Sequence, residues 1–301
     1  MSKAVFLGYL RLMRPANLPT AAADIFAGAA ISGGALLLES STFWSSGLGM
    51  LLIWLLLSTV SLYAGGVVMN DVFDYELDKI ERPERALPSG LISVKSAAIF
   101  GCILLLIGVL CAFMVSVVSG TIAVFLAIAI LLYDGVSKKH AFIGPLNMGI
   151  CRGLNLLLGM SLVTIYGIWW YSCIPILYIF AITLISRGEV HGDNKKHLVF
   201  AGLLYGLVIT AVLLFSQFKG VPVFRTIPFL VLFGLAIYVP LVKAYRSNSP
   251  KNIKGAVIAG VLSLIILDAA IAIGYTNWLY GLLMLLLLAL SFGLSKLFAV
   301  T

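Results

Sequence analysis

Residues 48–90 read LGMLLIWLLLSTVSLYAGGVVMNDVFDYELDKIERPERALPSG. The first part of this stretch is apolar and uncharged over about 20 residues, which is the length that a helix needs to cross a bilayer. From Asn70 onward, carboxylates and basic residues follow one another closely. The stretch therefore predicts a membrane-spanning helix that ends in a dense charged segment at the membrane surface.

The composition of the whole chain is that of a polytopic membrane protein. Of its 301 residues, 61% are hydrophobic and only 11% are charged, whereas about a quarter are charged in soluble domains. Apolar runs predict ten spanning segments, at 17–38, 45–70, 95–117, 119–134, 142–165, 170–187, 197–217, 226–244, 252–274 and 276–298. We therefore expect an all-α transmembrane bundle of about nine or ten helices. No linker divides residues 1–301, which predicts a single transmembrane domain.

The basic residues indicate how the helices are oriented. If the N-terminus is cytoplasmic, all 20 lysines and arginines fall in cytoplasmic segments except Arg152, Lys219 and Arg225. Cytoplasmic loops of membrane proteins carry such an excess. Topology thus explains the net charge of +8, and no nucleic-acid partner is expected. The expected location is a bacterial plasma membrane, with the N-terminus in the cytoplasm.

The charged segment after the second apolar run contains three carboxylates at helical spacing. On a continuous helix, Asp71, Asp74 and Asp78 fall within about 60° of one another. Like charges so close repel unless a cation joins them, and Mg²⁺ binds carboxylates together with water and substrate phosphate. We therefore predict a catalytic Mg²⁺ site here, from which Glu76 points away. The alternative is a solvated loop that only marks topology.

A second charged loop on the same membrane face runs from Arg187 to Lys196 as RGEVHGDNKK. Glu189 and Asp193 have i,i+4 spacing, so a continuing helix would place them on one face. Two facing carboxylate clusters can hold two Mg²⁺ ions with a diphosphate between them, and His191 can add a hydrogen bond or a proton. Basic residues would neutralise the remaining charge: Lys79, Arg82, Arg85, Lys138, Arg187 and Lys195. The alternative is a pair of unrelated charged loops.

Polar residues inside the predicted spans are candidates for a cavity lining. A charge in hydrocarbon normally faces a cavity or pairs with another charge, and Arg152, Asp24 and Asp268 all lie within spans. Two interpretations of Arg152 stay open: a substrate contact, or an ion pair with Asp24 or Asp268 that fixes helix packing. Further candidate substrate-binding residues are Asn17, Tyr63 and Asn155.

Several of these segments together resemble one known family. The pattern Asn70-Asp71-x-x-Asp74-x-x-x-Asp78, followed by Arg82-Pro83-x-Arg85-x-Leu87-Pro88-Ser89-Gly90, is similar to the first motif of the UbiA superfamily of intramembrane prenyltransferases. Other matching segments are Arg14-Pro15-x-Asn17, Tyr133 with Lys138, Arg152, and Gly192-Asp193. The resemblance covers nearly the whole chain and looks closest to the EboC-like branch.

The resemblance implies about nine spans around a central cavity, with both motifs at its cytoplasmic end and a lateral opening for membrane lipid. It also implies Mg²⁺-dependent transfer of a prenyl group from an allylic isoprenyl diphosphate to an aromatic or other small hydrophobic acceptor. The metal-binding and catalytic residues would be Asp71, Asp74, Asp78, Glu189 and Asp193, and Asn70 and Tyr133 would join the substrate-binding residues. The second motif of the family usually begins with aspartate, so Glu189 is one methylene longer.

A second hypothesis keeps this fold and removes the chemistry. The protein would then bind, present or transport a prenylated or secondary-metabolite precursor, which the Glu189 departure and the branch resemblance favour. The intact first motif favours an enzyme. An ion-coupled transporter would need ionisable residues and broken helices at the bilayer midplane; Asp24 and Asp268 fit that pattern, but the acidic clusters at the membrane surface do not.

Overall fold

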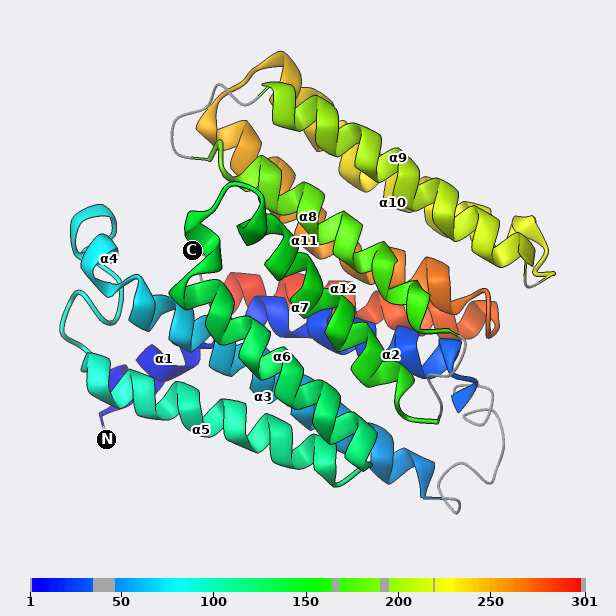
Figure 1. Ribbon diagram of the computed structural model, residues 1–301. Helices are drawn as coiled ribbons and strands as arrows, with labels where there is room; N and C mark the ends of the chain where they lie inside the picture. Colours follow the sequence, from blue (N-terminus) through cyan, green and yellow to red (C-terminus); the bar gives the residue numbers. More distant parts are fainter. Residues whose placement is uncertain (1, 35–46, 164–167, 190–194, 219, 299–301) are drawn as a thin grey trace.

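The computed structural model describes residues 2–34, 47–163, 168–189, 195–218 and 220–298, and the regular structure in these ranges is helical, with no strand (Figure 1). The α-helices are α1 (Lys3–Leu12), α2 (Leu18–Ile31), α3 (Leu48–Phe73), α4 (Tyr75–Glu81), α5 (Val94–Phe113), α6 (Val117–Gly135), α7 (Ile143–Met160), α8 (Cys173–Ser186), α9 (Lys195–Phe218), α10 (Val223–Arg246), α11 (Pro250–Ala272) and α12 (Trp278–Leu297). Short 3₁₀ helices are η1 (Pro15–Asn17), η3 (Ser137–Lys139) and η4 (Trp169–Ser172). The all-α prediction is confirmed over these ranges.

Each apolar segment predicted to cross the membrane coincides with one helix: α2, α3, and α5 to α12 in chain order. In the described part of the chain, eight helices have the length and hydropathy of membrane spans, with η4 and α8 counted together as Trp169–Ser186. The other two are α2, which is described over 14 residues, and α7, which carries Asn147, Arg152 and Asn155 among its apolar residues. The chain is thus a multi-pass membrane protein whose two least typical spanning segments are α2 and α7.

Two short helices, α1 and α4, lie outside the predicted spans. α1 begins after Ser2, whose side-chain oxygen accepts a hydrogen bond from the amide of Val5. The ring of Tyr9 in α1 packs edge-on against Phe100 of α5. After α1, Arg14 adopts the left-handed conformation, with φ of 47°. This turn sends the chain from α1 into the bundle at η1.

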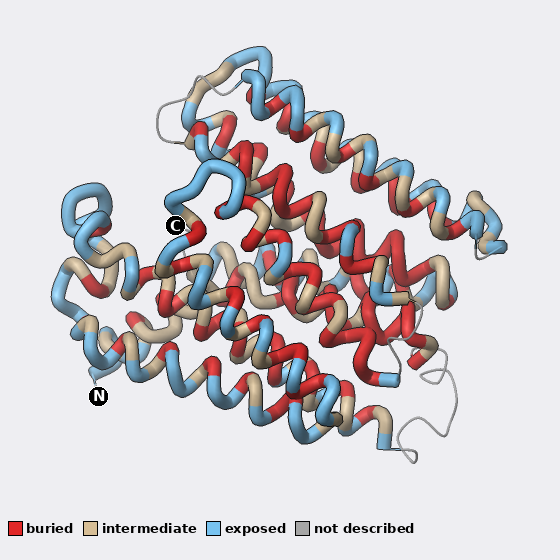
Figure 2. The backbone as a smooth tube through the Cα atoms, viewed as in Figure 1, coloured by how far each residue is buried: buried red, intermediate tan, exposed pale blue. Residues whose placement is uncertain are grey.

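The helices α2 and α7 lie at the centre of the bundle, between α3, α5 and α6 on one side and α8 to α11 on the other (Figure 1). Buried residues are concentrated on α2, α7, α8 and α11, whereas α5, α9 and α10 have exposed outer faces (Figure 2). Those faces carry large apolar side chains such as Leu106, Leu207 and Leu235, which suit contact with lipid tails. The polar residues of α2 and α7 are therefore held in the interior of the bundle.

The crossing of α2 and α7 depends on two glycines. A Cβ atom at Gly28 would lie 2.5 Å from the amide nitrogen of Met160, and one at Gly159 would lie 2.7 Å from the Cα of Ile25. Small residues at such crossings let helix backbones approach closely in a membrane. We expect Gly28→Ala and Gly159→Ala each to destabilise the fold by about 1–3 kcal/mol, measured as a lower Tm in detergent.

Gly255→Ala in α11 is the matched control, because a Cβ atom there meets no other atom within 4 Å. Alanine is favoured over glycine in a helix interior by up to about 1 kcal/mol, so the control should keep or raise Tm. A Tm for Gly28→Ala equal to that of the wild type would show that α2 and α7 can move apart without a loss of stability.

Candidate active site

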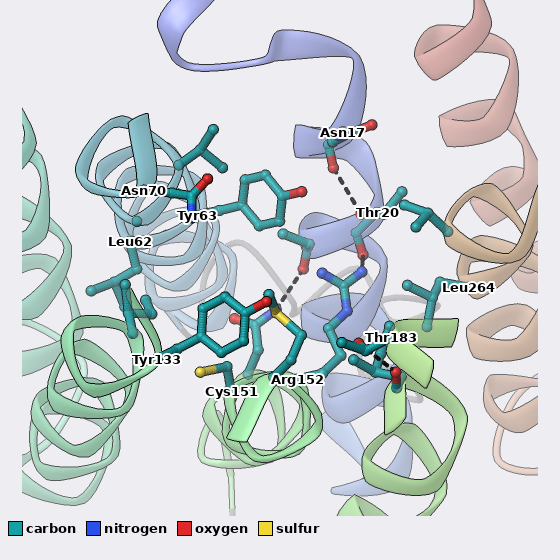
Figure 3. A pocket seen from close by; sticks show the side chains of 18 of the residues that line it. Asn17, Thr20, Leu62, Tyr63, Asn70, Tyr133, Cys151, Arg152, Thr183 and Leu264 are labelled. Atoms are coloured by element: carbon teal, nitrogen blue, oxygen red, sulfur yellow. Dashed lines mark hydrogen bonds between the residues drawn. The ribbon is translucent and has the colours of Figure 1, made fainter. Parts of the chain in front are cut away.

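A cavity of about 380 Å³ lies among α2, α3, α6, α7, α8 and α11 (Figure 3). Its volume falls within the range of small-molecule sites. Part of its wall is apolar, with Leu62, Ile130 and Ile182, and part is polar, with Thr20 and Thr59. Six of the predicted substrate-binding residues line it: Asn17, Tyr63, Asn70, Tyr133, Arg152 and Asn155. The central cavity implied by the sequence resemblance is therefore present.

The first acidic motif lies at the end of the cavity where Arg14 and Asn70 form its wall. Asp71 accepts a hydrogen bond from Nη2 of Arg14 at 2.7 Å and lies 3.5 Å from Nη1 of Arg85. The same Nη1 of Arg85 donates to Oδ2 of Asp78 at 2.8 Å. The side chains of Asp71 and Asp78 are only 10% and 6% exposed. Arg85 therefore balances two carboxylates that would otherwise be costly to bury together.

Asp74 contacts a different cation. It accepts a hydrogen bond from Nζ of Lys138 in η3 at 2.6 Å. α3 ends at Phe73 and α4 begins at Tyr75, because the backbone at Asp74 has φ of −89° and ψ of 3°. The expectation of one continuous helix is therefore corrected, because α3 and α4 are separate helices. Asp71 and Asp78 meet at Arg85, whereas Asp74 pairs with Lys138.

Asp134, near the end of α6, is a site residue that was not predicted. Its Oδ1 accepts a hydrogen bond from Nδ2 of Asn70 at 2.8 Å, and the residue lines the cavity. It precedes Lys138 of η3 by four residues, so the end of α6 and the following η3 each supply one contact to the first motif. The available signal was an acid beside Tyr133 at the end of an apolar run, since acids in spans usually face a cavity.

The polar wall of the cavity is a network that joins α2, α3 and α7 (Figure 3). Nε of Arg152 lies 2.9 Å from Oδ2 of Asp24, and Nη2 donates to the carbonyl of Thr20 at 2.6 Å. Asn155 donates to Oδ2 of Asp24 at 2.7 Å and accepts from Thr59 at 2.7 Å. The ion pair of Arg152 with Asp24 is therefore present, and Arg152 also lines the cavity. Its contact with substrate stays a prediction.

The second motif is described only at its beginning. His191 and Asp193 lie outside the described residues, so their roles stay predictions. Glu189 follows α8 and is half-buried. Burial raises the pKa of its carboxyl above the usual range, while Lys254 of α11 and Arg82 oppose that rise. Arg82 follows the first motif in sequence, so the charge of a first-motif residue influences the carboxyl of Glu189. Lys254 was not predicted as a site residue.

Three predicted diphosphate-binding cations have partners elsewhere. Lys79 pairs with Glu76 at 2.9 Å, and the Glu76 side chain is 81% exposed, as expected for a residue that points away from the motif. Arg187 donates a hydrogen bond to the backbone carbonyl of His140, which precedes α7. Lys195, at the start of α9, lies 5.7 Å from the centre of a tyrosine ring in α10. None of the three lines the cavity as described.

Comparison with known proteins places the chain in a family. The model of the UbiA prenyltransferase family matches residues 26–259. The chain belongs to the UbiA prenyltransferase family. One UbiA-like relative is the digeranylgeranylglyceryl phosphate synthase of Methanosarcina mazei, which is 31% identical over 193 residues, covering 62% of this chain and 64% of the relative. The chain thus spans just under two thirds of that relative's length.

Solved structures share the UbiA fold. A structure of digeranylgeranylglyceryl phosphate synthase has a TM-score of 0.67 and 22% sequence identity, covering 90% of this chain and 98% of the other. A UbiA homologue from Archaeoglobus fulgidus, solved with GPP and Mg²⁺, has a TM-score of 0.65 and 15% identity, covering 88% of this chain and 99% of the other. The cavity and motifs described above therefore lie in a UbiA-type bundle.

The donor set of this UbiA-family site suits a divalent cation of the Mg²⁺ type. Asp71, Asp74 and Asp78 offer hard carboxylate oxygens at one end of the cavity, which is the ligand type that Mg²⁺ prefers. Over the described ranges, no three acidic, histidine or cysteine side chains converge on one metal-binding point. Each carboxylate is balanced by Arg14, Arg85 or Lys138. The carboxylates are thus of the ligand type that Mg²⁺ prefers, and in the described structure Arg14, Arg85 and Lys138 neutralise their charge.

Proposed function

We propose that this UbiA-family protein transfers a prenyl group from an allylic isoprenyl diphosphate to a small hydrophobic or aromatic acceptor within the membrane, with Mg²⁺ as cofactor. The observation that carries the proposal is the set of carboxylates, Asp71, Asp74 and Asp78, paired with cations at one end of a largely apolar cavity. The name of the Methanosarcina mazei relative and the A. fulgidus structure with GPP and Mg²⁺ support the same chemistry.

The diphosphate binds where the cations and carboxylates meet. Arg14, Arg85 and Lys138 hold their carboxylates at 2.7, 2.8 and 2.6 Å, and the same donors form charge-assisted hydrogen bonds to phosphate oxygens. When bound, Mg²⁺ supplies positive charge that stabilises the leaving diphosphate. The residues that would hold it are Asp71, Asp74, Asp78 and Glu189, together with Asp193.

The prenyl chain occupies the apolar part of the cavity, against Leu62, Ile130 and Leu264. These side chains exclude water from the allylic carbon, so the carbocation that forms when the C–O bond breaks lasts until the acceptor attacks. Tyr63 and Tyr133 line the same space, and aromatic rings attract cations. In this scheme the protein needs no covalent nucleophile.

Diphosphate release tests the proposal. Purified protein is incubated with Mg²⁺, one of several allylic diphosphates (dimethylallyl, geranyl or a longer homologue) and a panel of acceptors. We expect release that requires both Mg²⁺ and an acceptor. Tight binding of a prenylated ligand with no release from any donor would instead identify a carrier.

The Glu189 position distinguishes an enzyme from a carrier by mutation. If Glu189 holds the metal, Glu189→Asp should retain much of the activity, because the charge is kept. Glu189→Gln keeps the size and removes the charge, so we expect it to lower diphosphate release about a hundredfold. The measurement is the initial rate of release for both variants and the wild type. Equal rates for Glu189→Gln and the wild type would remove Glu189 from the metal site.

The proposal treats residues 1–301 as one domain in a plasma membrane, with the N-terminus in the cytoplasm. The basic loops support this orientation. Contacts between the two ends of the chain support one domain, because Tyr280 of α12 donates to the carbonyl of Phe26 at 2.8 Å and Ser291 donates to the carbonyl of Ala16. The relative from M. mazei is archaeal; a bacterial membrane and the EboC-like branch stay predictions.

A further inference from the structure

Two buried acids lie behind the polar wall of the cavity. Behind Arg152 lie Asp24 and Asp268, which are 0% and 1% exposed. Asp24 lies 2.9 Å from Nε of Arg152 and accepts a hydrogen bond from Asn155 at 2.7 Å. This carboxylate therefore matches the guanidinium of the network, and Asp268 is a second buried acid. The network has no surplus positive charge.

The other charged groups that line the cavity also have partners. Arg14, Asp134 and Arg152 are the only Asp, Glu, Lys or Arg residues among those described in its wall. Arg14 pairs with Asp71 at 2.7 Å, and Asp134 accepts a hydrogen bond from Asn70 at 2.8 Å. Apart from the cations at the first motif, which serve the diphosphate, the cavity wall has no surplus positive charge.

A prenyl chain alone does not account for the polar wall. Thr59, Arg152 and Asn155 all line the cavity, and hydrocarbon placed against polar groups forms no hydrogen bonds with them. Ligand sites that are mostly apolar use a few polar groups of this kind to orient a polar part of the ligand. The polar wall therefore suits the second substrate of the proposed reaction, the acceptor.

We propose that the acceptor places an uncharged polar head, such as a hydroxyl or carbonyl group, against Thr59, Arg152 and Asn155, and that heads bearing phosphate or carboxylate are disfavoured there. This inference rests on the proposed prenyl transfer. An anionic head would lose its hydration beside Arg152, whose charge Asp24 already matches at 2.9 Å, with no unmatched cation to receive it. The proposed acceptor carries no phosphate, whereas the product that the name of the M. mazei relative gives is a phosphate.

The test compares neutral and anionic acceptors built on the same skeleton, namely methyl 4-hydroxybenzoate with 4-hydroxybenzoate, and a glycerol ether with its phosphate. Diphosphate release is measured with geranyl diphosphate and Mg²⁺. Binding is measured separately by calorimetry on protein loaded with geranyl thiolodiphosphate, an analogue that resists ionisation. We expect the neutral member of each pair to bind and react at least tenfold better. Equal or better use of the anionic member overturns the inference, and so does failure of every neutral member to bind.

A double variant tests whether this network causes the preference for neutral acceptors. Asp24→Asn combined with Asp268→Asn removes the charge that balances Arg152, so the preference for neutral acceptors should fall at least tenfold. Thr226→Val is the matched control, because Thr226 is fully buried in α10, away from the cavity. An unchanged preference in the folded double variant overturns the assignment. If the double variant does not fold, the comparison of acceptor pairs on the wild type still tests whether neutral acceptors are preferred.

The outcomes separate this inference from the proposed function. One outcome is that geranyl diphosphate binds with Mg²⁺ and diphosphate is released, but neutral acceptors are not preferred. That result would support prenyl transfer and reject the proposed acceptor class. No binding of geranyl diphosphate and no release with any acceptor would reject prenyl transfer itself.

Discussion

Asp71→Asn and Asp74→Asn are each expected to lower kcat/KM for the allylic diphosphate about a thousandfold. Both substitutions keep the side-chain size and remove one negative charge. Asp71 lies between Arg14 and Arg85, and Asp74 is the partner of Lys138, so each change also removes the group that positions a diphosphate-binding cation. The measurement is initial-rate kinetics of diphosphate release on purified protein.

Glu76→Gln is the matched control, because Glu76 belongs to the same acidic segment but is exposed and pairs only with Lys79 within the described structure. It should keep wild-type rates. Tm values measured alongside separate lost chemistry from lost folding. If Asp71→Asn and Asp74→Asn fold and turn over like the wild type, the acidic segment marks topology only.

Removal of divalent cations should raise the Kd for geranyl diphosphate at least about a hundredfold, equivalent to about 2.7 kcal/mol. The three carboxylates of the first motif repel a diphosphate unless additional positive charge is present. Arg14, Arg85 and Lys138 can donate hydrogen bonds to the diphosphate, but their charges are already matched by those carboxylates, so the motif without metal has no net positive charge. Calorimetry in EDTA and in excess Mg²⁺ measures the difference.

Two controls accompany this experiment. Adding Mg²⁺ back after EDTA should restore binding fully, which excludes damage to the protein. Glu76→Gln should show the same dependence on Mg²⁺ as the wild type, because Glu76 is exposed and paired outside the first motif. Equal Kd values in EDTA and Mg²⁺ would contradict a site in which metal and carboxylates act together.

The membrane-spanning helices were predictable because a simple physical requirement decides them. A span needs about 20 apolar residues, and every predicted segment coincides with a helix. The ion pair between Arg152 and Asp24 was foreseen as one of two options, since charges in hydrocarbon need partners. α1 and the break at Asp74 were not foreseen, because both depend on contacts with other parts of the chain, such as Phe100 on α1 and Lys138 on Asp74.

Within the site, closeness in sequence was a poor guide to closeness in space. Lys79 is adjacent to Asp78 but pairs with Glu76, whereas Lys138 reaches Asp74 across 64 residues. Lys254 belongs to no motif and affects Glu189 only because α11 packs near the end of α8. Such partners are set by helix packing, which local sequence patterns do not encode.

The network around Asp24 also sets the order in which the protein is built. Asn155 is 131 residues beyond Asp24, so at ordinary ribosomal speeds roughly ten seconds pass before α7 emerges with the partners of that carboxyl. Asp268 is synthesised later still. Until then α2 carries an acid that hydrocarbon disfavours. The carboxyl of Asp24 gains its partners only when α7 packs against α2, so the N-terminal half of the chain completes its interior with residues that are synthesised later.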